Sequence, residues 1–299
     1  MRLQVLAAIA FAGLFVTAGA AQKKPAVGHS RRIFANVTDS AGAPVLDLKP
    51  EHFEIREGAK TQRVLAASLG SSPMRIALMV DTSDATDKAL NHMRAGLGAF
   101  LDALPPEAEV LIVTTGRQVR VRVQPTTDRK KLKDLTNGLF SDGGATPLRD
   151  GLMEIDDRFF KKAPDRWPLF VIVTGDGAES SSEAIEKRFN TWLNDLPARG
   201  ISAHGFALKY RGGGVPDAIT QQVVQMGGGM FDFMNTSNSL PDKLKALGER
   251  LAADAKLMST WYQLDFETSG NGSQAVDVRL SRSGVTVKLS NVRATSGRP

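Results

Sequence analysis

The chain of 299 residues contains no cysteine. This absence excludes disulfides, zinc–thiolate sites, cysteine nucleophiles and a cysteine-linked lipid anchor. Several catalytic signatures are missing as well, because the chain has no Walker loop, no His-Glu-x-x-His motif and no Gly-x-Ser-x-Gly elbow. The sequence therefore lacks the motifs that identify P-loop nucleotidases, zincin proteases and α/β-hydrolases.

The chain also lacks any strong concentration of charge. Its formal net charge is +6, but no segment gathers basic residues as nucleic-acid-binding proteins do. Hydrophobic residues make up 42% of the chain, which also has 28 glycines, an ordinary composition for a globular protein. We therefore expect no nucleic-acid partner, whereas an acidic protein partner is compatible with the charge. The length suits one large or two modest domains with a real core.

The first residues have the pattern of a secretory signal peptide. Arg2 is the only charge before an apolar stretch at 3–21, which ends in small residues around Ala20 and Ala21. We predict that residues 1–21 are a signal peptide, cleaved near Ala20-Ala21, and that the protein is secreted or periplasmic. The alternative is an uncleaved membrane anchor, because the stretch is long enough to span a bilayer. After removal of the signal, no transmembrane segment is expected.

The remaining chain divides into a linker, two β-rich flanks and a central part. Residues 22–31 are polar and are predicted to be a linker. Residues 32–72 and 256–299 contain short alternating runs separated by turn residues, a pattern typical of antiparallel strands. The strands are predicted at 33–37, 53–56, 62–67, 262–267, 275–280 and 285–289. Because neither flank is large enough to hold a core alone, we expect the two to pair into one small β-sandwich.

The central part, residues 73–255, alternates apolar strands with amphipathic helices. This alternation is typical of a parallel sheet that is covered by helices on both faces. Ser180 and Glu183 have the spacing of a capping box, so a helix is expected to begin there. The predicted fold class is α/β: a doubly wound, mostly parallel, Rossmann-like sheet inserted between the N- and C-terminal β segments.

Oxygen-bearing side chains follow the predicted strands of this central part. Asp81 and Ser83 follow the strand at 76–80, Asp176 follows the strand at 169–173, and Thr146 lies in a glycine-rich loop. In open parallel sheets, ligands bind in the crevice beyond the carboxyl ends of the strands. We therefore expect these side chains to converge at that edge of the sheet.

The spacing of these residues resembles that of a von Willebrand factor type A (vWA) domain. The metal-ion-dependent adhesion site of that family uses an Asp-x-Ser-x-Ser motif, a distant threonine and a distant aspartate. The matching metal-site residues in this sequence are, in order, Asp81, Ser83, Thr146 and Asp176. The second serine of the motif is replaced by Ala85, which removes one hydroxyl ligand. Another water or the neighbouring Asp84 can compensate for it, with a lower affinity.

The flank that precedes the central part resembles that of bacterial secreted vWA-related proteins. Residues 37–48 fit the pattern V-x-D-x-x-G-x-P-V-x-D-L, and Phe-Glu-Ile-Arg-Glu-Gly follows at 53–58. The resemblance therefore extends over almost the whole mature chain.

The resemblance implies a bound Mg²⁺ or Mn²⁺ ion. Mg²⁺ prefers near-octahedral oxygen ligands at about 2.0–2.1 Å and keeps several waters. Ser83 and Thr146 would supply neutral hydroxyls, while Asp81 and Asp176 would supply charge, partly through water. Such a site leaves one position open, which the carboxylate of a protein partner can fill. The alternative is a domain that keeps the fold and binds no metal.

Each motif also has a purely structural interpretation. An Asp-x-Ser sequence after a strand is commonly a helix N-cap, and an aspartate before glycine, as at Asp176, is commonly a turn residue. Thr146 precedes a proline and can be an extended loop residue without a ligand role. The order, spacing and placement of all the motifs together favour the vWA-like fold over these separate explanations, while Ala85 leaves both the metal-bound and the metal-free alternatives open.

The sequence leads to a hypothesis of function and to two alternatives. The hypothesis is an exported, non-catalytic binding protein that engages a protein partner through its strand-end face, with no catalytic residues. The first alternative is a divalent-metal-dependent hydrolase in which Asp81, Asp84, Asp176 and Glu179 surround the ion that activates water. The second alternative is a metal-free scaffold of the cell envelope.

Overall fold

The computed structural model describes residues 29–70, 73–197, 199–209, 214–268 and 275–290. The predicted signal peptide at 1–21 and most of the predicted linker lie outside the described residues. Among the described residues, no helix combines the length and the apolar character needed to cross a bilayer.

The central part of the chain forms a six-stranded sheet with the strand order β10-β9-β8-β5-β6-β7. Only β7, at one edge, runs antiparallel to its neighbour; the other pairs are parallel. The inner strands are almost continuous runs of buried apolar residues, as expected for a sheet that is covered on both faces. The strands are β5 (Met74–Val80), β6 (Glu109–Thr114), β7 (Arg120–Thr126), β8 (Trp167–Gly175), β9 (Ser202–Leu208) and β10 (Gly228–Met234).

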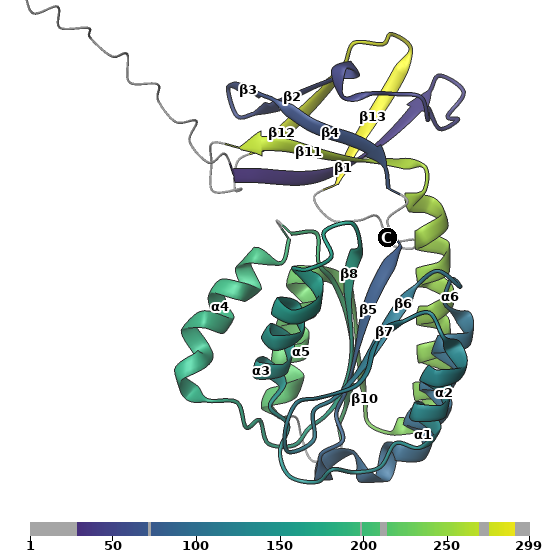
Figure 1. Ribbon diagram of the computed structural model, residues 1–299, viewed down its shortest axis with the longest axis vertical. Helices are drawn as coiled ribbons and strands as arrows, with labels where there is room; N and C mark the ends of the chain where they lie inside the picture. The colour runs from purple at the N-terminus through teal and green to yellow at the C-terminus, as the bar shows by residue number, and fades with distance from the viewer. Residues whose placement is uncertain (1–28, 71–72, 198, 210–213, 269–274, 291–299) are drawn as a thin grey trace, which may run out of the picture.

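Helices cover both faces of this sheet (Figure 1). One face packs against α1 (Leu90–Ala103), α2 (Arg129–Asn137) and α6 (Leu240–Met258), whose apolar residues share one core cluster. The other face packs against α3 (Leu148–Ile155), α4 (Glu186–Asp195) and α5 (Val215–Gly227), which share a second core cluster. The predicted doubly wound, mostly parallel α/β fold is confirmed.

The two flanks of the chain form the sheets of a small β-sandwich. One sheet has the order β13-β1-β11-β4 and the other has the order β12-β2-β3, so each sheet combines strands from both flanks. The α/β domain is therefore inserted between β4 and β11, as predicted. The strands are β1 (His29–Asp39), β2 (Phe53–Glu57), β3 (Lys60–Gln62), β4 (Val64–Leu69), β11 (Trp261–Thr268), β12 (Val276–Leu280) and β13 (Val285–Ser290).

Three boundaries differ from the sequence predictions. Strand β1 begins at His29, inside the predicted linker at 22–31, because it pairs with β11 from that residue onward. Helix α6 continues to Met258, beyond the predicted domain boundary at residue 255. The capping-box prediction is wrong: a 3-10 turn (Glu183–Ile185) with Ser182 at its N-cap leads into α4 at Glu186. The backbone N–H of Ser180 bonds the carbonyl oxygen of Thr146 at 2.9 Å.

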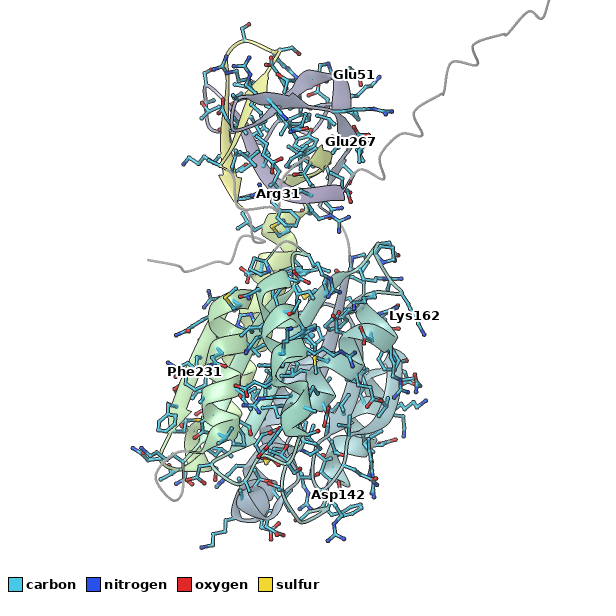
Figure 2. All side chains as sticks on the ribbon, turned by 90° about the vertical axis from the view of Figure 1, so that its left-hand side faces the viewer. Arg31, Glu51, Asp142, Lys162, Phe231 and Glu267 are labelled. Carbon is cyan, nitrogen blue, oxygen red and sulfur yellow. The ribbon has the colours of Figure 1, made fainter. Side chains whose placement is uncertain are left out.

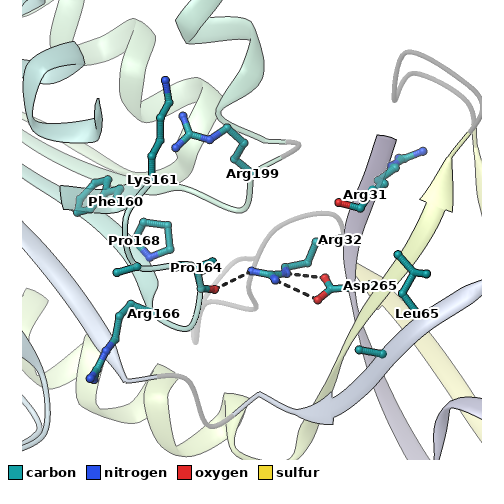
Figure 3. A pocket seen from close by; sticks show the side chains of 13 residues that line it. Arg31, Arg32, Leu65, Phe160, Lys161, Pro164, Arg166, Pro168, Arg199 and Asp265 are labelled. Atoms are coloured by element: carbon teal, nitrogen blue, oxygen red, sulfur yellow. Dashed lines mark hydrogen bonds and ion pairs between the residues drawn. The ribbon is translucent and has the colours of Figure 1, made fainter. Parts of the chain in front are cut away.

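The sandwich contacts the α/β domain at the amino-terminal ends of the parallel strands. Arg32 of β1 forms a bidentate ion pair with Asp265 of β11 and donates to the carbonyl oxygen of Pro164, which precedes β8 (Figure 3). These residues line a cavity of about 500 Å³ between the two parts. The carboxyl ends of the strands consequently lie at the opposite end of the molecule, where Asp142 is seen in Figure 2.

Candidate functional site

Asp81 stands directly after β5 and is almost completely buried. Its backbone N–H bonds the carbonyl oxygen of Val173, so the residue is held at the carboxyl end of the sheet. One carboxylate oxygen accepts from the backbone N–H of Ser83 at 2.9 Å, and the other accepts from Gly175 at 3.0 Å and from the Thr174 hydroxyl at 3.3 Å. Burial raises the pKa of Asp81, although these hydrogen bonds oppose the shift. A nearby cation would favour its charged form.

Ser83 presents a buried hydroxyl oxygen without a hydrogen-bond partner. This oxygen lies close enough to Asp81 to help lower the pKa of that carboxyl, but it makes no hydrogen bond of normal geometry. It also faces Gly177, since it lies 3.8 Å from the position that a Cβ atom would take there. Buried hydroxyls normally have partners, so this oxygen is available to a ligand or a water.

Thr146 is fixed beside the same strand ends. Its backbone N–H bonds the carbonyl oxygen of Ala178, and its own carbonyl oxygen accepts from Ser180, both at 2.9 Å. Its buried hydroxyl lies 2.8 Å from the hydroxyl of Thr115, the residue after β6. Thr115 was not among the predicted site residues, although its place directly after a strand could have indicated it.

Asp84 is an exposed residue of the site that also holds the glycine-rich loop. Its Oδ2 accepts from the backbone N–H of Gly144 at 3.1 Å, and its Oδ1 lies 3.2 Å from where a Cβ atom of Gly143 would be. Both glycines have positive φ values, +72° and +71°, which side chains with a Cβ atom rarely adopt. One carboxylate oxygen of Asp84 is therefore engaged by the loop, and its compensation for Ala85 stays a prediction.

Asp176 follows β8 and is largely buried, with 8% of its surface exposed. It lines a cavity of about 500 Å³ together with Asp84 and Ala85. The methyl group of Ala85 packs against the backbone of Gly177, 2.7 Å from the position that a Cβ atom would take there. Ala85 has the Cβ atom that a serine of the vWA motif would have but no Oγ, so no side-chain oxygen is supplied at this position.

Asp217, in the first turn of α5, is a residue that the sequence analysis missed. Only 6% of it is exposed, and its Oδ2 accepts from the backbone N–H of Gly214 at 3.3 Å. Its Oδ1 is buried and has no hydrogen-bond partner. Burial, reinforced by the negative charges of Asp176 and Asp81, raises the pKa of Asp217 to about 6.

Glu179 does not join these carboxylates. Its Oε1 accepts from the backbone N–H of Arg149 at 3.3 Å, and its Oε2 accepts from that of Ser181 at 3.2 Å, so it caps the start of α3 and its neighbouring loop. Within the described part of the chain, no three carboxylate or histidine groups converge closely enough to bind one ion directly. The geometry therefore disfavours the carboxylate-rich centre of the hydrolase alternative.

The comparisons with known proteins identify the central domain. Residues 76–178 match the family model of the von Willebrand factor type A domain, a range that includes all four predicted metal-site residues. This domain is a vWA domain. The resemblance predicted from the sequence is confirmed, and vWA domains in general are non-catalytic domains that mediate protein–protein interaction.

Two solved structures are similar to this chain at low sequence identity. A von Willebrand factor type A protein from Catenulispora acidiphila is 12% identical, with a TM-score of 0.52 over 87% of this chain and 72% of that one. The conserved hypothetical protein BatB from Bacteroides thetaiotaomicron is 14% identical, with a TM-score of 0.48 over 61% of this chain and 99% of that one. A search of curated proteins gives no match.

The residues present fit a hard divalent cation, which vWA domains often bind as Mg²⁺ or Mn²⁺. The unpartnered hydroxyl of Ser83 beside the buried carboxylate of Asp81 is a donor set of the required chemistry. Ala85 leaves one direct protein ligand fewer than the motif normally has, so a water would take that place.

Proposed function

We propose that the protein is an exported, non-catalytic binding protein, whose vWA domain engages a protein partner at its strand-end face through a divalent cation. The observation that carries this proposal is the buried, unpartnered hydroxyl of Ser83 next to the buried carboxylate of Asp81. Export rests on the signal-peptide pattern of residues 1–21.

Four side chains would hold the cation. Ser83 and Thr146 would bind it through their hydroxyls, while Asp81 and Asp176 would orient its waters and balance its charge. When bound, the ion supplies an electrophilic coordination position that a carboxylate of the partner can occupy. The backbone hydrogen bonds from Ser83 and Gly175 keep the Asp81 carboxylate in one orientation before any ion arrives.

The rim of the site supports a partner with acidic side chains. Arg117 is exposed, and no carboxylate pairs with it in the described part of the chain. Its backbone is held beside the glycine loop by a 2.9 Å bond to Ala145 and has a φ of 57°, rare for a residue with a side chain. The guanidinium of Arg117 would attract acidic groups of the partner, next to the carboxylate that binds the metal ion.

We expect Mg²⁺ or Mn²⁺ to stabilise the folded protein against heat. At an ion concentration 100 times Kd, binding linkage raises the free energy of unfolding by about 2.7 kcal/mol. Ser83→Ala should lose this shift yet unfold nearly like the wild type in chelator, because the hydroxyl makes no hydrogen bond of normal geometry. Ala85→Ser should enlarge the shift. Calorimetric melting curves that coincide in metal and in chelator would instead support the metal-free scaffold.

Partner capture tests the function itself. The wild-type protein, immobilised and exposed to an envelope extract, should retain its partner in Mg²⁺ and release it in chelator. Ser83→Ala should capture little in either condition, and Arg117→Glu should weaken capture because it removes the unpaired cation. Retention that is equal in Mg²⁺, in chelator and with Ser83→Ala contradicts the proposal. Metal-dependent turnover of a phosphoester, abolished by Asp81→Asn, would favour the hydrolase.

A further inference from the structure

Asp217 has one carboxylate oxygen whose position the fold does not explain. Its Oδ2 accepts from the backbone N–H of Gly214 and so satisfies a free donor at the start of α5. Its Oδ1 is buried, with no hydrogen-bond partner, although a carboxylate in the first turn of a helix is usually exposed to water. Helix capping therefore explains the position of Oδ2 but not that of Oδ1.

A close backbone contact fixes Asp217 next to the predicted metal-site residues. A Cβ atom on Gly214 would lie 2.8 Å from the carbonyl carbon and oxygen of Asp176, so only glycine permits this approach. Because Gly214 also donates to Asp217, the first turn of α5 is attached to the loop that carries Asp176.

The charges around Asp217 are predominantly of one sign. Asp176 and Asp81 both act on it as negative charges, and Lys209 is the weaker, opposing positive charge. Like charges in a poorly hydrated site are unfavourable unless a cation lies among them. The unpartnered hydroxyl of Ser83 is an independent sign that a ligand belongs at this place.

We propose that Asp217 is a further residue of the cation site, where its Oδ1 accepts a hydrogen bond from a water bound to the metal. This inference rests on the proposed metal-dependent function. Direct ligation is not required, since no three carboxylates converge on one point in the described structure. The added negative charge offsets the hydroxyl ligand that Ala85 fails to supply. Asp217 thus acts as a positioning residue for the water shell of the ion.

Isothermal titration of the full chain with Mg²⁺ and with Mn²⁺ tests this role. Asp217→Asn keeps an oxygen that can accept from Gly214, so the helix cap survives while the charge is lost. Outer-sphere partners of a metal typically contribute 10–100-fold to affinity, so we expect the variant to bind about 10-fold more weakly or worse. The matched control is Asp150→Asn, which removes a carboxylate from the first turn of α3 and should leave Kd within about twofold.

Stability in chelator gives a second readout. Without metal, Asp217→Asn should be at least as stable as the wild type, because it removes a negative charge that Asp176 and Asp81 disfavour. A purely structural role for the charge would instead lower stability in chelator and leave Kd unchanged, and that result overturns the inference.

The outcomes separate this inference from the function on which it rests. Wild-type binding that Asp217→Asn leaves unchanged overturns the role of Asp217 alone. A wild-type protein that binds neither ion overturns the metal-dependent function and this inference with it. Weakened binding in Asp217→Asn, with normal binding in Asp150→Asn, supports both.

Discussion

A chain that ends at Met258 is expected to lose the β-sandwich and to keep a folded vWA domain. The truncation removes β11 and β13, which are the two neighbours of β1, and β12, which pairs with β2. The remaining pair β2–β3 is a short hairpin, and such a hairpin is marginal in water on its own. The vWA domain retains all of its strands and α6, and its core cluster loses only the contacts of Phe34 and Trp261, which come from the sandwich.

Limited proteolysis and circular dichroism measure this outcome. Residues 29–69 should become rapidly cleavable, while the vWA domain should resist cleavage and still unfold cooperatively on heating. A chain that ends at Ser290 keeps every strand of the sandwich and serves as the control. Protection of residues 29–69 in the shorter chain would contradict the interdependence of the two flanks.

The second large effect concerns His204, which is buried in β9. Its Nδ1 accepts from the backbone N–H of Met230 at 3.1 Å, and its Nε2 has no partner. Burial, assisted by the positive charge of Arg250 on α6, lowers the pKa of His204 to about 3. The unfolded chain binds a proton near pH 6.5, whereas the folded chain does not. The contribution of His204 to the free energy of unfolding is therefore fully present above pH 6.5 and is lost as the pH falls toward 3.

The comparison variant is His204→Asn, whose Oδ1 can replace Nδ1 as the acceptor but does not titrate. From pH 6.5 to pH 4, the free energy of unfolding of the wild type should fall by about 3 kcal/mol relative to this variant. The comparison with the variant is needed because Asp217 has a raised pKa and affects stability in the opposite sense. Its contribution to the free energy of unfolding increases as the pH falls from 6 toward 3.8. Urea titrations at several pH values measure the difference between wild type and variant, and parallel profiles would show that His204 does not govern the acid response.

Local sequence pattern predicted the elements of the fold well. The apolar run at 76–80 became β5 (Met74–Val80), and the run at 169–173 became the core of β8, because buried parallel strands need continuous apolar residues. The start of α4 was predicted wrongly. The backbone N–H of Ser180 bonds the carbonyl oxygen of Thr146, and Ser180 does not cap the helix. Tertiary contacts of this kind leave no local trace in the sequence.

The candidate site was only partly accessible from the sequence. Asp81 and Asp176 follow apolar strands, so strand-end reasoning placed them at one edge of the sheet. Asp217 lies three residues beyond Gly214, and its approach to Asp176 depends on a backbone contact between segments far apart in the chain. The hydrogen bond between Asp84 and Gly144 was not predicted for a similar reason, because it depends on the folded shape of the glycine-rich loop.

The insertion of the vWA domain also has a mechanical consequence. The chain leaves the sandwich after Leu69 and returns at Trp261, and these connections touch, since the backbone N–H of Gly70 bonds the carbonyl oxygen of Trp261. Two adjacent tethers resist swivelling far better than a single flexible linker would. A partner that binds the sandwich would therefore hold the carboxyl ends of the vWA strands, at the opposite end of the molecule, in a nearly constant orientation.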